Sequence, residues 1–205
     1  MRFSALALPV LLAGCLIRDY ARGLSAFEGE RWDTAAENFE RALVDSDMKP
    51  EQLARAAGLL FEAYERLDRW DDARRALERG ADVLLADYRI LDMSPAERAK
   101  IPAPVLFRYH WRVGRGALIG LDKTLTAPLR AKKVEIAELH FRRGLEIQTT
   151  TQLGQLLRGE LLAELLEALA AVGRRSGQDL AEAERIAAGV GGRAADLKAR
   201  LEKLR

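Results

Sequence analysis

The most reactive side chain in this sequence is the thiol of Cys15, the single cysteine of the chain. It follows Arg2, an apolar run over residues 3–12 and the small residues Ala13 and Gly14. A basic residue, a short apolar run and a small-residue cleavage site are typical of a secretory leader. The run is too short to cross a bilayer, which requires about 20 apolar residues. The sequence therefore predicts export, with the thiol close to the cleavage point.

Residues 12–15, with the sequence LAGC, resemble the lipobox of bacterial lipoproteins. The resemblance implies that residues 1–14 are a signal peptide and that Cys15 is lipidated on its sulfur and becomes the new amino terminus. Two or more acyl chains hold a protein stably at a membrane. In that family an aspartate after the cysteine favours the inner membrane, so Leu16 implies the outer membrane, facing the periplasm. An ordinary secretory leader with an incidental cysteine, or a weak membrane anchor, is the alternative.

Sequence signatures of enzymes are missing from the chain. It contains no Gly-x-Ser-x-Gly, His-Glu-x-x-His or phosphate-loop motif. The glycines over residues 114–120 are weakly similar to a dinucleotide fingerprint, but they follow a predicted helix where the fingerprint requires a strand. We expect Gly116 and Gly120 to be close-packing positions on one helix face instead. The sequence therefore predicts a protein that is not an enzyme and has no cofactor.

His110 and His140 are the two histidines of the chain. They could face each other across two neighbouring helices, with Glu138 nearby. A metal site needs three or four converging ligands, and residues two apart on a helix, such as Glu138 and His140, point in different directions. We therefore predict partly buried or groove-lining histidines and no metal.

Positive charge is concentrated between residues 101 and 145, whereas residues 19–98 carry more acids than bases. Three arginines there share one helix face, with aromatic residues interleaved, and such residues anchor protein interfaces. The predicted partner-binding residues are Arg108, Tyr109, Arg112, Arg115, Lys132 and Lys133. This surface would bind an acidic peptide or protein, or lie against anionic lipid headgroups; a solvated helix face is the alternative. The net charge of +2 argues against nucleic acid as a main ligand.

The elements that position these residues are predicted to be helices. Ala, Leu, Arg and Glu dominate the composition, and these residues favour helices. Asp33 is predicted as an N-cap, and Ser94 with Glu97 as the capping box of a short helix. The longer helices are predicted over residues 16–27, 33–44, 51–67, 70–86, 104–121, 129–147, 151–172, 179–188 and 193–204.

Trp32 and Trp70 each begin a copy of one pattern. Each is followed, at the same intervals, by a small, a large apolar and a second small residue, which are Ala35, Phe39 and Ala42, then Ala73, Leu77 and Gly80. Helix, tight turn and helix at this length resemble the tetratricopeptide repeat, although the period is longer than in that family. The resemblance implies an all-α fold, a right-handed superhelix (α-solenoid) of about four helical hairpins with a C-terminal capping helix. Residues 15–205 would form this single domain.

Together the two resemblances imply a lipid-anchored periplasmic scaffold or adaptor. It would hold a protein partner in a cell-envelope assembly, secretion or motility complex, which is an argument from fold-level analogy. A small-molecule-binding accessory lipoprotein of a transport system and a regulator of a cell-wall enzyme are the alternatives. A long open groove would favour the scaffold, and a closed pocket with buried arginines would favour the small-molecule binder.

Overall fold

The structure is a computed structural model of the chain. It describes residues 7–44, 48–86, 93–122 and 124–205, and side chains from residue 18 onward except that of Pro95. Within these ranges all regular secondary structure is helical and no strand is present, which confirms the prediction of an all-α protein. The side chain of Cys15 lies outside the described side chains.

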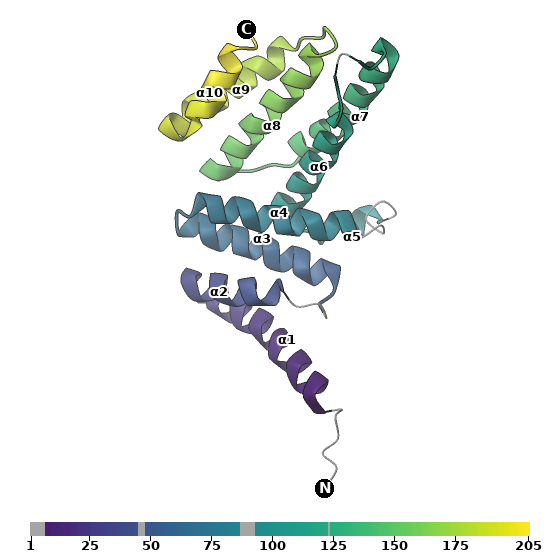
Figure 1. Cartoon of the computed structure of the whole chain (residues 1–205). Helices are drawn as coiled ribbons and strands as arrows, with labels where there is room; N and C mark the ends of the chain where they lie inside the picture. The colour runs from purple at the N-terminus through teal and green to yellow at the C-terminus, as the bar shows by residue number, and fades with distance from the viewer. Residues whose placement is uncertain (1–6, 45–47, 87–92, 123) are drawn as a thin grey trace. The chain divides into compact units, whose positions relative to one another are not determined.

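The chain divides into two compact units, residues 1–105 and residues 106–205. The first contains α1 (Ala7–Glu28), α2 (Trp32–Ala42), α3 (Pro50–Arg66), α4 (Trp70–Ala86), α5 (Pro95–Arg98) and the start of α6 (Ala103–Leu118). Here α1 packs against α2, α2 against α3 and α3 against α4, and α1 also contacts α3 (Figure 1). Helices that are consecutive in the sequence are therefore neighbours in space. The predicted single domain over residues 15–205 stays a prediction.

Two turns of the first unit share one backbone conformation. Glu30, after α1, and Asp68, after α3, have positive φ angles of 56° and 58°. In each turn the next N–H donates to the carbonyl five residues earlier over 2.9 Å. Left-handed residues with this bond are typical of a Schellman ending, which satisfies carbonyls that the helix leaves unpaired. Each turn leads directly to the tryptophan that begins the next helix, at Trp32 and Trp70, so the turn recurs together with the sequence pattern.

Of the two predicted helix starts that rest on capping residues, one is confirmed and one is corrected. The capping box is confirmed, because the Ser94 N–H donates to Glu97 Oε2 over 2.8 Å and the Glu97 N–H donates to Ser94 Oγ over 3.3 Å. The prediction of Asp33 as an N-cap is wrong, because Arg31 is the N-cap of α2 and Asp33 lies inside its first turn. The Asp33 carboxylate still favours the helix there, since the amino end of a helix attracts negative charge.

Small residues bring the helices of the first unit close together. A Cβ atom added to Gly23 in α1 would lie 2.7 Å from the ring of Phe39 in α2, and Phe39 is fully buried. At Gly80 in α4, an added Cβ would lie 2.9 Å from the Cβ of Ala57 in α3. At both positions a larger side chain would force the neighbouring helices apart.

The second unit is built around one apolar helix. It contains most of α6, then α7 (Ala127–Leu145), α8 (Gln152–Ala170), α9 (Gly177–Val190), the 3₁₀ helix η2 (Gly191–Ala194) and α10 (Ala195–Glu202). α7 and α9 both pack against α8, and α10 contacts α8 and α9. α8 buries leucines around most of its circumference, which is typical of a central helix. Leu197 and Leu201 of α10 are buried.

The glycine that packs closely in α6 differs from the predicted ones. Gly116 and Gly120 face open space, so the prediction of close packing at these two positions is wrong. Gly114 instead abuts the ring of Phe141 in α7, where an added Cβ would overlap the ring. Gly120 lies just after α6 with a φ angle of 70°, a conformation that glycine adopts without steric cost.

Gly114→Ala is expected to lower the free energy of unfolding by about 1–3 kcal/mol, because the added methyl must displace the buried Phe141 ring. The matched control, Gly116→Ala in the same helix, is expected to raise it by up to about 1 kcal/mol, because alanine is the better helix former. Denaturant unfolding followed by circular dichroism measures both values. Equal stabilities for the two variants would contradict the packing of α6 on α7.

Candidate functional site

The six predicted partner-binding residues lie on two helices of the second unit. α6 carries Arg108, Tyr109, Arg112 and Arg115, and α7 carries Lys132 and Lys133. Arg115 and Lys132 are exposed, whereas the Tyr109 side chain is only 6% exposed. Burial raises the pKa of the Tyr109 phenol. Tyr109 therefore belongs to the core and not to an exposed binding surface, which corrects that part of the prediction.

Two of the predicted arginines interact with groups of their own unit. Trp111 is buried and donates from Nε1 to Glu164 of α8 over 2.8 Å. The Arg108 guanidinium lies 4.2 Å from the centroid of the Trp111 ring, a cation–π distance. Arg115 Nε lies 3.4 Å from the same Glu164 carboxylate. Trp111, Arg108 and Arg115, which come from the segment that the sequence assigns to partner binding, therefore make contacts within the second unit.

The two lysines of α7 have different environments. Lys133 Nζ donates to the backbone carbonyls of Ala117 and Ile119 over 3.3 and 2.7 Å. Its ammonium thus satisfies carbonyls at the end of α6, where a positive charge is favourable. Lys132 is exposed, and its nearest carboxylate is that of Glu135 on the same helix at 3.1 Å. Such an exposed pair contributes little stability, so Lys132 remains accessible to a partner.

His110 and His140 face each other between α6 and α7, as predicted. Their Nδ1 atoms lie 3.3 Å apart, and both side chains are half-buried. Burial, and next the nearby Arg143, lower the pKa of His140. Among the described residues, no three His, Cys, Asp or Glu side chains form a group that could hold a metal ion. The pair therefore acts as a contact between two helices whose hydrogen bond needs a neutral ring as its acceptor.

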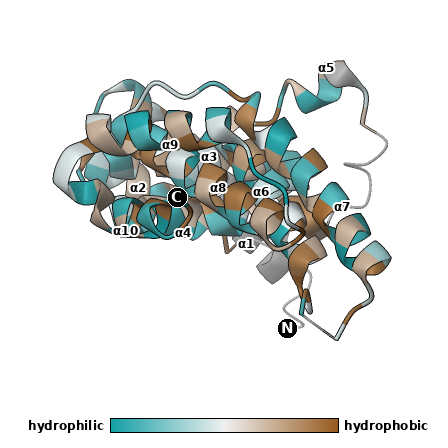
Figure 2. Cartoon of the chain, turned by 90° about the horizontal axis from the view of Figure 1, so that it is seen from above, coloured by the Kyte–Doolittle hydropathy of each residue, from teal (hydrophilic) through white to brown (hydrophobic). Residues whose placement is uncertain are grey.

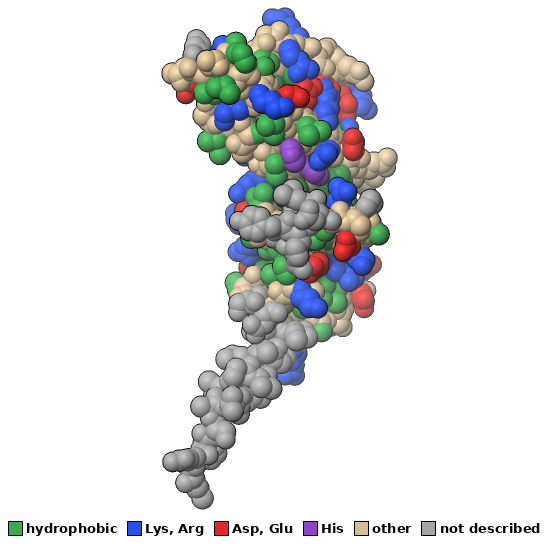
Figure 3. All heavy atoms as spheres, turned by 90° about the vertical axis from the view of Figure 1, so that its right-hand side faces the viewer, with side chains coloured by type: hydrophobic (Ala, Val, Ile, Leu, Met, Phe, Trp, Pro, Cys, Tyr) green, Lys and Arg blue, Asp and Glu red, His purple; other side chains and the backbone are tan. Residues whose placement is uncertain are grey.

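α7 also carries an exposed surface that we did not predict. Leu129, Ile136 and Leu139 are 55, 41 and 50% exposed, and Lys132 and Arg143 are exposed on the same side of the helix. We call these five residues the α7 stripe. Their positions are separated alternately by three and four residues, a spacing that could have identified the stripe in the sequence. Hydrophobic and hydrophilic residues alternate along α7 in Figure 2. Figure 3 shows Lys, Arg and hydrophobic side chains around the histidines.

Ion pairs fix α7 on the side next to α9. Arg142 donates to both carboxylate oxygens of Asp179 over 2.7 and 2.6 Å. Burial alone would raise the pKa of Asp179, but hydrogen bonds from Arg142 and Ser176 lower that pKa overall. Glu138 accepts from Arg174 over 2.7 Å. Sequence reasoning missed Asp179 as a partner of Arg142, because the two are distant in the chain and no local pattern joins them.

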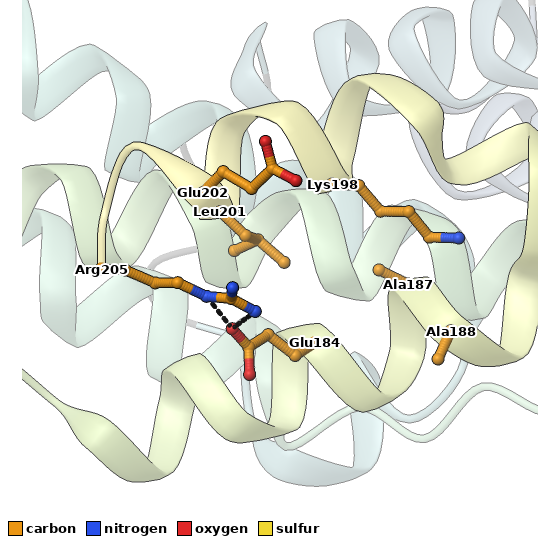
Figure 4. A pocket seen from close by; sticks show the side chains of 7 residues that line it. All are labelled: Glu184, Ala187, Ala188, Lys198, Leu201, Glu202 and Arg205. Atoms are coloured by element: carbon orange, nitrogen blue, oxygen red, sulfur yellow. Dashed lines mark hydrogen bonds and ion pairs between the residues drawn. The ribbon is translucent and has the colours of Figure 1, made fainter.

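Two shallow hollows lie at the carboxyl-terminal end of the second unit. The one between α9 and α10 has a volume of about 240 Å³, and the ion pair of Glu184 with Arg205 at 2.8 Å lines it (Figure 4). This volume is below the range of about 300–1,000 Å³ that is usual for ligand pockets. The second hollow, of about 340 Å³, combines Arg175 and Lys203 with the apolar Leu180.

No family model, curated protein or solved structure matches this chain. In the described part of the chain no helix is both long enough and apolar enough to cross a membrane.

Protonation of His140 is expected to destabilise the fold. Because burial and Arg143 hold the folded pKa of His140 below its ordinary 6.5, the unfolded chain binds the proton more readily. The stability contributed by the neutral ring is therefore fully present above pH 6.5 and is lost as the pH falls through the folded pKa. Denaturant unfolding of wild type, His140→Gln and the control Lys132→Gln across this range measures the effect. His140→Gln should show the flattest dependence on pH, and a slope equal to that of wild type would contradict the expectation.

Proposed function

We propose that the chain is a lipid-anchored scaffold of the bacterial cell envelope that holds a protein partner. The α7 stripe carries the proposal, because large apolar side chains exposed together on one helix are typical of interaction surfaces. Arg143 and Lys132 on the same surface supply the positive charge that the sequence assigns to partner binding. The anchor would be Cys15 in a processed lipoprotein of the outer membrane, facing the periplasm.

The arrangement of helices supports a superhelix that resembles tetratricopeptide repeats. In the first unit, the turns at Glu30 and Asp68 have the same conformation, and each leads to a tryptophan that begins the next helix. In addition, α1 contacts α3 directly. In the second unit, α8 contacts both α9 and α10. Stacked helical hairpins are expected to show contacts between a helix and the next two in sequence, as α1 and α8 do. Proteins of this architecture bind peptides and partner proteins on their extended surfaces, and this step of the proposal is an analogy.

A small-molecule binder is the second candidate. The hollow of about 340 Å³ favours it, because Arg175 and Lys203 lie beside an apolar wall that includes Leu180 and Leu204. Such a hollow suits an amphipathic molecule with a carboxylate or phosphate group. Native mass spectrometry of the purified protein separates the two candidates, because a bound metabolite supports the binder and a stoichiometric protein partner supports the scaffold.

Cys15→Ser is expected to abolish labelling by a fatty-acid probe and to release the protein from the membrane fraction, because the variant lacks the sulfur that would carry the acyl chains. A partner recovered by crosslinking from the wild-type membrane fraction should then be lost from that fraction. Leu16→Asp is the matched control. It keeps the acylated cysteine and should move the protein from the outer to the inner membrane. Labelling of Cys15→Ser at the wild-type level would contradict the anchor.

A further inference from the structure

We propose that the α7 stripe binds an acidic amphipathic helix of the protein partner, an inference that rests on the proposed scaffold function and names the chemistry of its partner. The opposite side of α7 is already in use, because Val134, Ala137 and Phe141 are fully buried in the second unit. α7 therefore has two apolar faces, of which one holds the helix in the core. The other face, which carries the α7 stripe, is exposed.

Three contacts hold α7 in place, two of them to α6 and one to α9. Phe141 rests against the backbone of α6 at Gly114, and Lys133 bonds to the carbonyls that end α6. On the side away from α6, Arg142 forms a bidentate ion pair with the buried Asp179. A binding surface that does not have to be ordered on association loses less free energy when it binds. The exposed leucines and isoleucine thus form a preformed row and not a frayed helix.

The spacing of the α7 stripe suits a helix as its occupant. Leu129, Lys132, Ile136, Leu139 and Arg143 follow the alternation of three and four residues that lets two helices pack along a shared seam. A partner helix with apolar residues at matching intervals would cover the leucines and the isoleucine. Recognition of an amphipathic helix by an apolar surface is a common mode of protein binding.

Charge decides which helix fits. Both charged members of the α7 stripe are basic, and the stripe contains no acid. Antiparallel pairing of two copies about Ile136 would place Leu129 opposite Arg143 and Lys132 opposite His140, so four positive charges would share one seam whose facing positions hold no acid. An anionic lipid surface would attract the two bases, but it would repel the exposed Glu135 of α7 and Glu146, the residue that follows the helix. A helix, unlike a lipid surface, carries its charges at discrete positions, so it can place acids opposite Lys132 and Arg143 and uncharged residues near Glu135 and Glu146.

The test uses the full-length Cys15→Ser protein and two synthetic helical peptides. Both peptides carry leucines at the positions that would face Leu129, Ile136 and Leu139. The positions that would face Lys132 and Arg143 carry glutamate in the first peptide and lysine in the second. Fluorescence anisotropy measures binding of each peptide at low and high salt. The acidic peptide should bind at least tenfold more tightly than the basic one and weaken at high salt, because exposed charges are screened. Since the protein in this assay is unlipidated, the result is independent of the anchor tested by fatty-acid labelling.

Variants of exposed residues separate the α7 stripe from other surfaces. Lys132→Glu with Arg143→Glu should weaken the acidic peptide at least tenfold and reverse the preference in favour of the basic peptide. Ile136→Asn should weaken it to a similar extent. The matched control, Arg185→Glu with Lys198→Glu, changes the net charge equally on exposed positions of α9 and α10 and should alter binding less than twofold. Circular dichroism melting of each variant confirms that it is folded.

Four outcomes would overturn the proposal. They are equal binding of the two peptides, no binding of either, binding of the protein to phosphatidylglycerol vesicles in place of the peptide, and a dimer in sedimentation that Ile136→Asn abolishes. The third outcome would make the α7 stripe a lipid contact, and the fourth would make it a self-association surface.

Discussion

Close approach between neighbouring helices is the constraint on which the other features depend. Gly23 lies against the Phe39 ring in the first unit, and Gly114 lies against the Phe141 ring in the second. At Gly159 of α8 an added Cβ would lie 2.6 Å from a leucine of α10, so the same device recurs in the second unit. A backbone without a Cβ lets a bulky side chain pack directly on a helix axis and bury apolar area with few residues. Since the chain has one cysteine, no intramolecular disulfide can replace this packing.

This packing also determines which charged side chains remain accessible. Because α6 packs on α7, Lys133 donates a hydrogen bond to a carbonyl at the end of α6. The Trp111 ring packs against the Arg108 guanidinium, and its N–H donates to Glu164. The predicted basic surface is therefore divided. Part of it holds α6 to its neighbours, and Lys132 is the exposed lysine that remains with the α7 stripe.

Most of the helices can be predicted from the sequence, but few of the contacts at the candidate site can. Helix boundaries follow local signals such as the capping box at Ser94 and the turn at Asp68, which act within a few residues. Close packing at Gly114, and not at Gly116, depends on which side of α6 meets α7, and small residues alone do not define that side. Glu164 escaped prediction for a related reason. Its partners lie on another helix, and no spacing along the chain connects them.

The hydrophobic periodicity of α7 does not reveal that the helix has a second, exposed apolar face. A helix with one apolar face has apolar and polar residues on opposite sides. α7 instead has apolar residues buried on the Phe141 side and exposed on the Ile136 side. Summed over both faces, the pattern of a surface helix is weakened, although each face keeps its own regular spacing. The two bases on the α7 stripe, Lys132 and Arg143, lie on the same face as its apolar side chains. They also restrict what can cover it, since a partner must supply both apolar surface and negative charge.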